Sequence, residues 1–326
     1  VASVLSAAPG EHPFPKLAFY ERFVAIDNAC GWPQLTLLSD GTLACLIWPH
    51  PVHGTTEGAV ECWLSTDGGK LWKKAGVPVP NAPTTNRMNH AGGLAADGSY
   101  VALVAGWDNR KRPAGSEPNP LVEADDLESG DGKTLRPVPA VSRDGGHTWK
   151  QFPAVIDGDS AQTIYEELTP FGRIAPLPNG TLGVMFYSGY AAAFFYTSGD
   201  GGVTWQKRGL VSDDHNPCEP AWLRLDNGDL YAAVRHDLGN RSPAGIGGMN
   251  GYRSTDGGQT WKPEGALTPP GHLPGDLTRL PDGRLLLTYG VRNDGDRGIN
   301  IRIGDAEARI WSYPIRLVDN EGATDE

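Results

Sequence analysis

One eight-residue motif occurs four times along the 326-residue chain, and it restricts the fold more than any other feature. It has the form S-x-D-x-G-x-x-W and starts at Ser65, Ser142, Ser198 and Ser254, which places the motif aspartates 77, 56 and 56 residues apart. In such a motif the short Asp side chain accepts backbone N–H bonds, glycine supplies a positive φ, and Trp re-enters a strand. Because this turn is complete without a ligand, we interpret the motif residues as structural.

Five hairpin patterns accompany the motifs, each with an apolar run on both sides of an Asp-Gly or Asn-Gly pair. They span residues 35–48, 89–107, 173–187, 219–235 and 277–291. A hairpin followed by the motif gives four strands, and a four-stranded unit that repeats about every 50 residues is typical of a propeller blade. The sequence therefore predicts an all-β, single-domain β-propeller over residues 1–326, with five blades and six as the alternative.

Two segments outside this pattern carry their own predictions. The longer first spacing, together with a stretch rich in Pro, Gly and acidic residues, predicts a loop insertion in blade 2 at about residues 108–133. Residues 18–26 are expected to supply an outer strand that closes the ring, and residues 306–317 to supply the final strands.

Composition excludes several classes of function. The net charge is −11, which argues against a general nucleic-acid binder. No run approaches the roughly 20 apolar residues of a membrane-spanning helix. The four cysteines lack zinc or disulfide spacing, and no His/Asp/Glu spacing is diagnostic, so we expect neither metal nor cofactor. The start at Val1 agrees with removal of a signal peptide, so a secreted or periplasmic protein is expected.

The repeated motifs resemble the Asp-boxes of the sialidase (neuraminidase) superfamily, and the resemblance covers residues 32–311. In sialidases a Glu opens an inner strand and an Arg follows 16 residues later, a spacing that Glu219 and Arg235 share. The resemblance implies that Glu219 activates a nucleophile and that Arg235 is one of three arginines binding a substrate carboxylate. The chain departs from the superfamily in two places: Trp32 stands in the stretch of the first-blade Arg, and residues 273–277 contain no Tyr nucleophile.

Strand geometry predicts a site independently of this resemblance. The start of a hairpin's first strand and the end of its second strand lie at the same end, so residues about eight before and after each turn face each other at one mouth of the channel. The residues at these positions are Trp32, His50, Arg87, Asn89, His90, Trp107, Asp108, Arg173, Tyr187, Tyr190, Glu219, Arg235, His236, Asp276 and Arg292. Arg173, Arg235 and Arg292 fall on three consecutive blades, which predicts recognition of an anionic group. Aromatic rings at this end would form stacking walls for a sugar.

Three functions are compatible with this set of residues. In a glycoside hydrolase, Glu219 is the base or nucleophile and Asp276, Glu57 or Asp108 is the acid. In a uronate lyase, His90 or a Tyr abstracts a proton. In a binding module, the Glu219–Arg235 pair is only a salt bridge. We expect an exo-acting, sialidase-like hydrolase that binds a glycan with an acidic terminal sugar. Its predicted catalytic residues are Glu219, His90 and Asp276, and its predicted substrate-binding residues are Arg173, Arg235, Arg292, Arg87, Asn89, Trp32, Tyr187 and Trp107.

Overall fold

The computed structural model describes residues 23–29, 31–51, 56–108, 133–157, 168–189, 191–237 and 247–319, which form strands and turns without any helix. The predicted insertion at about 108–133 therefore lies almost wholly outside the described residues, between the end of β8 and the start of β9. Tyr190 and residues 18–22 also lie outside them.

The strands form successive four-stranded antiparallel runs, which we call units 1 to 5. Unit 1 contains β1 (Gly31–Leu37), β2 (Leu43–Trp48), β4 (Glu61–Ser65) and β5 (Lys73–Gly76). Unit 2 contains β7 (Asn89–Leu94), β8 (Tyr100–Asp108), β9 (Lys133–Ser142) and β10 (Lys150–Gln151). Unit 3 contains β12 (Leu168–Pro176), β13 (Leu182–Ser188), β14 (Ala192–Ser198) and β15 (Thr204–Ser212).

The remaining units follow the same order. Unit 4 contains β16 (Pro217–Arg224), β17 (Leu230–His236), β18 (Met249–Ser254) and β19 (Lys262–Ala266). Unit 5 contains β20 (Gly275–Arg279), β21 (Leu285–Val291), β22 (Gly298–Gly304) and β23 (Ile315–Asp319). Three short strands, β3 (Gly58–Ala59), β6 (Asn86–Arg87) and β11 (Val155–Ile156), make parallel pairs, β3 with β6 and β11 with β15.

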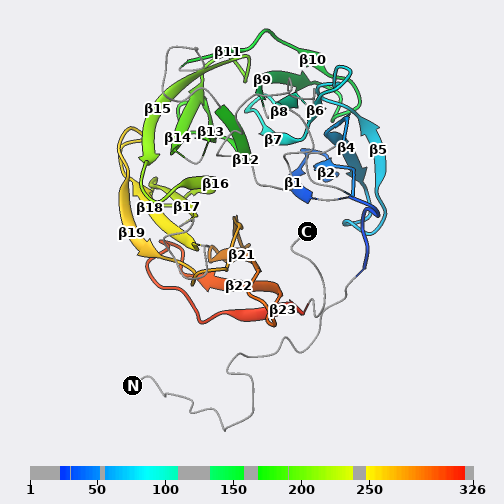
Figure 1. Ribbon diagram of the computed structural model, residues 1–326. Helices are drawn as coiled ribbons and strands as arrows, with labels where there is room; N and C mark the ends of the chain where they lie inside the picture. Colours follow the sequence, from blue (N-terminus) through cyan, green and yellow to red (C-terminus); the bar gives the residue numbers. More distant parts are fainter. Residues whose placement is uncertain are drawn as a thin grey trace, which may run out of the picture.

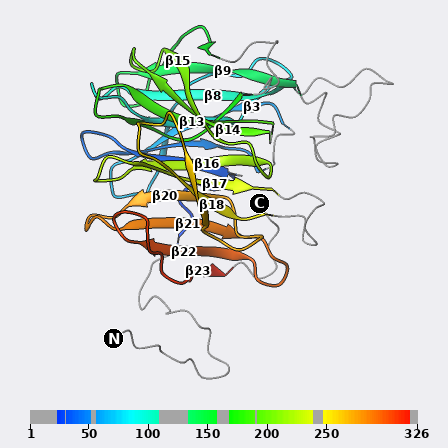
Figure 2. The same cartoon turned by 90° about the vertical axis from the view of Figure 1, so that its left-hand side faces the viewer.

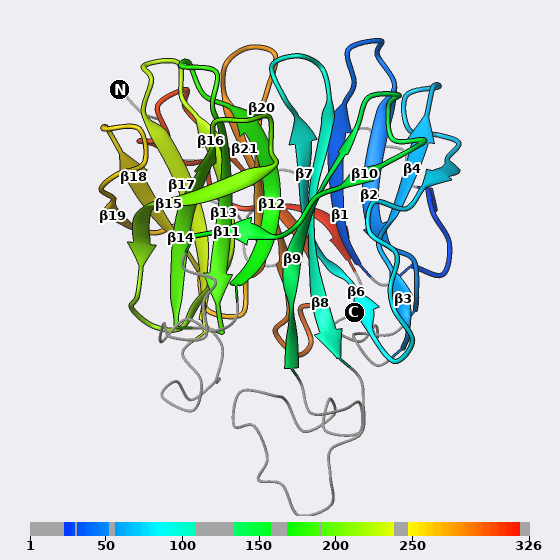
Figure 3. The ribbon, with the colours of Figure 1, turned by 90° about the horizontal axis from the view of Figure 1, so that it is seen from above.

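The units follow one another around a common centre in chain order, with the first strand of each unit innermost (Figure 1). Units 2 and 3 are joined into one nine-stranded sheet by parallel pairing of β7 with β12. In side view units 4 and 5 lie next to each other (Figure 2). The turns that connect β1 to β2 and β7 to β8 lie at one end of the ring, and β8 ends at the other (Figure 3). This second end is where the candidate site was predicted.

Apolar side chains fill the spaces between consecutive units. Among the described residues, separate clusters join unit 1 to 2, unit 2 to 3, unit 3 to 4 and unit 4 to 5. Trp222 of β16, for example, packs edge-on against Phe195 of β14, with 4.9 Å between ring centroids. The alternation of side chains along each strand supplies both faces of these clusters, because every inner unit packs against two neighbours.

The space between unit 5 and unit 1 differs from the other interfaces. The inner strands β1, β7, β12, β16 and β20 contact one another in that order, but within the described ranges no contact of similar extent joins β20 to β1. Leu35 and Leu37 of β1 are accordingly 56% and 63% exposed. The predicted closing strand at residues 18–26 is not supported, because residues 23–26 form no strand and β23 is the outermost strand of unit 5.

The four repeated motifs form the same turn. In each, the Ser hydroxyl donates to the Asp carboxylate at 2.7–2.8 Å, and this carboxylate accepts further backbone N–H bonds. The Trp indole N–H donates to the carbonyl oxygen of the second glycine at 2.7–3.2 Å. The sequence had placed the Trp between sheets but had not indicated this indole bond, which closes the turn.

The second glycine of the motif also brings each turn against the preceding unit. A Cβ on this glycine would meet a side chain of that unit in three cases: Gly146 with Cys62, Gly202 with Val101, and Gly258 with Phe195. In unit 1 the same position, Gly69, would meet only Leu43 of its own unit, at 3.5 Å. All four glycines have φ between +89° and +98°. Unit 1 therefore has no preceding unit against its motif turn.

Candidate functional site

Glu219 and Arg235 form a buried ion pair at the predicted end of the ring. Glu219 lies near the start of β16 and Arg235 near the end of β17, and each residue is 8% exposed. Arg235 Nη1 donates to Glu219 Oε2 at 2.6 Å, and Arg235 Nη2 lies 3.5 Å from Asp237 Oδ2. Strand alternation predicted that Glu219 and Arg235 face each other, and they do. Asp237 was missed, although its place directly after the strand end was a usable signal.

The backbone is strained at two residues of this site. Glu219 has φ of +40° and Trp32 has φ of +53°, and neither is glycine. Each lies at a break in strand register, between Cys218 and Ala221 in β16 and between Gly31 and Gln34 in β1. Such bulges redirect a side chain, and left-handed non-glycine residues persist only where the surroundings hold them. Unit 1 and unit 4 thus direct Trp32 and Glu219 toward each other, and the Trp32 side chain hydrogen bonds to Glu219.

The charges around Glu219 keep it ionised. Burial raises the pKa of this carboxyl, but Arg235, Arg292 and the hydrogen bond from Trp32 outweigh burial and hold the pKa below its usual value. Arg292 follows β21 in unit 5, so side chains from units 1, 4 and 5 act on one carboxylate. Two guanidinium groups beside a carboxylate leave a net positive site, which suits an anionic ligand.

Arg173 is engaged elsewhere. It lies at a register break in the middle of β12, and its Nη2 donates to the carbonyl oxygen of Leu277 in β20 at 3.1 Å. It also attracts the carboxylate of Asp276. The described contacts therefore bring Arg235 and Arg292 to Glu219 and place Arg173 with Asp276. The expected cluster of three arginines is not assembled by these contacts.

Asp276 has the opposite protonation tendency to Glu219. The side chain is accessible to solvent on the surface of β20, yet the surrounding protein removes it from bulk water. This desolvation raises the pKa of Asp276, although Arg173 acts in the other direction. Two carboxyl groups whose environments shift their pKa values in opposite directions are suited to base and acid roles.

His90 does not have the geometry of a general base. Its Nδ1 lies 2.9 Å from the carbonyl oxygen of Met88, and its Nε2 lies 3.1 Å from that of Leu46. Both ring nitrogens thus face acceptors, and no lone pair is directed toward a substrate. His90 ties β7 to β2, which the sequence could not indicate because the partners are backbone carbonyls.

The other predicted residues are half-buried and have structural contacts. Arg87 Nη1 donates to the carbonyl oxygen of Arg136 at 2.9 Å. The backbone N–H of Trp107 donates to Asn86, and the Tyr187 ring packs edge-on against Phe171. Asn89 begins β7. Glu57 accepts the backbone N–H of Thr84 and is exposed, and Asp108 is 4% exposed at the end of β8. No printed contact brings these residues to Glu219.

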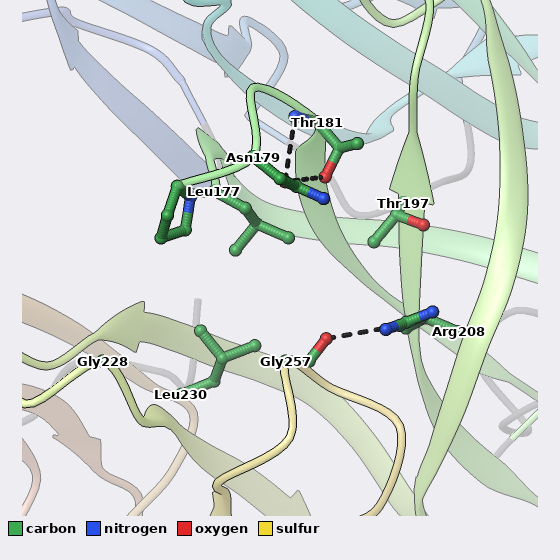
Figure 4. Close-up of a pocket in the computed structure, with 9 residues that line it drawn as sticks. Leu177, Asn179, Thr181, Thr197, Arg208, Gly228, Leu230 and Gly257 are labelled. Carbon is green, nitrogen blue, oxygen red and sulfur yellow. Dashed lines mark hydrogen bonds between the residues drawn. The ribbon is translucent and has the colours of Figure 1, made fainter.

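A separate pocket of about 300 Å³ lies at the opposite end, where the hairpin turns of units 3 and 4 meet (Figure 4). Leu177, Asn179 and Leu230 line it, and Arg208 Nε donates to the carbonyl oxygen of Gly257 at 3.4 Å. Because Glu219 begins β16 and this pocket adjoins its far end, the pocket is not part of the candidate site.

Two searches were restricted to the described residues. They hold no group of three or more His, Cys, Asp or Glu side chains that could bind a metal ion. They also include no helix long and apolar enough to cross a membrane.

An all-β ring of repeated four-stranded units, with a carboxylate–guanidinium pair at one end, defines a sialidase-like β-propeller. The chain belongs to the family described as "BNR repeat-like domain", which matches residues 128–324. No curated protein matches the chain.

Solved structures agree with this fold. A protein of unknown function from Dyadobacter fermentans is 23% identical with a TM-score of 0.65, covering 90% of this chain and 83% of that one. The Hadza microbial sialidase Hz136 is 20% identical with a TM-score of 0.65, covering 88% and 58%. The K499G mutant of NanB sialidase from Streptococcus pneumoniae is 14% identical with a TM-score of 0.63, covering 94% and 64%. This chain thus spans less than two thirds of the length of these two sialidases.

Proposed function

We propose that the protein is an exo-acting glycoside hydrolase that binds a glycan through the carboxylate of an acidic terminal sugar. The observation that carries the proposal is the buried pair of Glu219 and Arg235, with Arg292 acting on the same carboxylate. Guanidinium groups bind carboxylates in a planar, bidentate manner, so Arg235 and Arg292 would hold the sugar's anionic group. The sialidases among the structural neighbours support the substrate class by analogy of fold.

The proposed chemistry uses two carboxyl groups. Asp276, whose pKa is raised, donates its proton to the oxygen of the leaving alcohol. Glu219, whose pKa is lowered, accepts a proton from the attacking water or attacks the anomeric carbon itself. The glycosidic bond breaks, water supplies the new hydroxyl, and the free sugar and alcohol leave. Trp32 keeps Glu219 oriented through its hydrogen bond.

The test is to incubate the protein with sialosides and with uronate-bearing oligosaccharides and to identify the products by mass spectrometry. Glu219→Gln should lower kcat at least about 100-fold, the lower end of what a general base contributes. Arg235→Ala should abolish carboxylate recognition. Arg284→Ala, which removes an exposed pair with Asp282 at the hairpin end, is the matched control and should leave turnover unchanged. Unaltered turnover in Glu219→Gln would contradict the site assignment.

A non-catalytic, carbohydrate-binding propeller is the second candidate. It is favoured by the fact that Glu219 is already paired with Arg235 and Trp32, as in a structural ion pair. Retention of sialosides without any product would select this function. An unsaturated uronate product would select the lyase, although no contact of His90 favours it.

The overall architecture and setting are part of the proposal. We favour one propeller domain with five blades, because the described residues form five four-stranded units. The six-bladed alternative would place a further unit between β20 and β1. The expected location is secreted or periplasmic, which is the usual setting for proteins that act on external glycans.

A further inference from the structure

Three buried side chains from units 3 and 4 form a hydrogen-bonded chain beside the candidate site. Ser212, at the end of β15, lies with its Oγ 3.0 Å from the Tyr252 hydroxyl oxygen. The Tyr252 hydroxyl lies 3.0 Å from His236 Nε2, and the two rings are nearly parallel at 21°. Their exposed fractions are only 6%, 7% and 3%. The sequence had placed His236 near this mouth but gave no sign of its partners.

Donors and acceptors give this chain one consistent direction. The backbone N–H of Asp214 donates to Ser212 Oγ at 3.3 Å, the Ser212 hydroxyl then donates to Tyr252, and the Tyr252 hydroxyl donates to His236 Nε2. This order requires a neutral His236 with its proton on Nδ1. Burial lowers the pKa of His236, even though backbone hydrogen bonds with Asp214 and His215 oppose the shift. The neutral form is therefore favoured at neutral pH.

The chain encloses a strained turn that leads into Glu219. His215 and Asn216 are consecutive non-glycine residues with φ of +57° and +52°. Such residues persist only where their surroundings fix them. Ser212 holds the turn from one side through Asp214, and Asp237 holds it from the other, since its backbone N–H donates to the carbonyl oxygen of Asn216 at 3.2 Å.

The same turn is linked to the ion pair of the candidate site. Asp237 contacts Arg235, which in turn bonds to Glu219. Pro217 starts β16 directly after the turn, so any shift of Asn216 moves the strand start that carries Glu219. The charged and titratable groups around His236 are Asp213, Asp214 and His215 of the turn, Tyr252 of β18, and Arg235 and Asp237 of its own strand.

We propose that Ser212, Tyr252 and His236 are positioning residues that fix the left-handed His215–Asn216 turn and so hold Glu219 against Arg235. None of the three contacts the reacting atoms. The effect on turnover rests on the proposed function, whereas the effect on the turn does not.

Tyr252→Phe is the decisive variant because it removes one hydroxyl and retains the ring. The matched control is Tyr196→Phe, which removes an equally buried hydroxyl that donates to the carbonyl oxygen of Asp157, away from Glu219. Amide hydrogen exchange of the unliganded protein should become about five- to tenfold faster at residues 216 and 218–219 in Tyr252→Phe, and should not change there in Tyr196→Phe. Ser212→Ala should behave like Tyr252→Phe and replaces it if that variant is unstable.

Turnover of a sialoside provides the second readout. Tyr252→Phe and His236→Ala should lower kcat about tenfold with little change in KM, because Glu219 is displaced while the arginines remain. His236→Gln, whose amide oxygen can accept the Tyr252 bond, should recover most of kcat. A merely structural role would lower the melting temperature without this difference between kcat and KM.

The two proposals fail in different ways. If exchange at residues 216 and 218–219 is unchanged in both Tyr252→Phe and Ser212→Ala, the positioning proposal is wrong, whatever the activity. If exchange rises there but the wild-type protein neither binds nor cleaves any acidic glycan, the positioning proposal stands and the proposed function is wrong.

Discussion

Alanine substitution at the second glycine of the repeated motif separates backbone strain from packing between units. Gly69, Gly146 and Gly202 occupy the same position with φ of +90°, +98° and +93°. A left-handed non-glycine residue costs about 1–2 kcal/mol wherever it stands. That cost alone is expected for Gly69→Ala, because the nearest atom to the new Cβ is Leu43 Cδ1 at 3.5 Å, an ordinary contact.

At Gly202 a second cost is added. The new Cβ would lie 2.5 Å from Val101 Cγ1 in unit 2, so the side chain or the strand has to move. Overpacking of this kind costs about 1–3 kcal/mol, which gives a total of about 2–5 kcal/mol for Gly202→Ala. Gly146→Ala, with Cys62 Sγ at 2.6 Å, should fall in the same range.

The assay is urea denaturation of the three variants beside the wild-type protein. The change in free energy is obtained from the shift in midpoint and a common slope, and an unchanged slope shows that the native and unfolded states remain comparable. Equal losses in Gly69→Ala and Gly202→Ala would refute the reasoning, because they would mean that contact with the preceding unit adds nothing.

Three further measurements test other parts of the structure. Leu37→Glu should change the free energy of unfolding by less than about 0.5 kcal/mol, because Leu37 is 63% exposed, whereas Leu46→Ala in the core should cost about 2–5 kcal/mol; a large loss in Leu37→Glu would show that this face is covered. Burial lowers the pKa of His90 and His236, so the unfolded state binds more protons and stability, present above about pH 6.5, should be lost as the pH falls below it; pH-dependent melting with His236→Gln as comparison checks the sign, and flat melting between pH 7 and 5 would contradict it. Hydrogen bonds from Thr148 and Ser142 lower the pKa of Asp144 to about 2, so its carboxyl resonance should titrate in that region, and a midpoint near 4 would mean that the turn is open in solution.

The repeated motifs were sufficient to predict the strand units because their chemistry is local. Asp67 bonds only to residues within four positions, so its role can be derived from sequence neighbours alone. The pairing of Glu219 with Arg235 was predictable for a similar reason, since one hairpin register connects them. The role of His90 was not predictable, because its partners are carbonyls set by the packing of β7 on β2.

Arg173 shows the limit of arguments based on register. Its long side chain leaves a bulge in β12 and bonds to the backbone of Leu277, two units away along the ring. Period-two alternation does not hold across a bulge, and no sequence pattern marks this one. The strand expected at residues 18–26 is wrong for a different reason: an outer edge accepts any extended segment, and residues 315–319 occupy it.

The open side between units 5 and 1 gives the charge arrangement at Glu219 a mechanical meaning. Trp32 belongs to the first unit and Arg292 to the last, yet both act on a carboxylate carried by the fourth. Small rotations at the four packed interfaces add up at this open side. An anion gripped there would tie the two free ends of a C-shaped molecule together, so occupancy itself would act as the clasp that β20 and β1 do not provide.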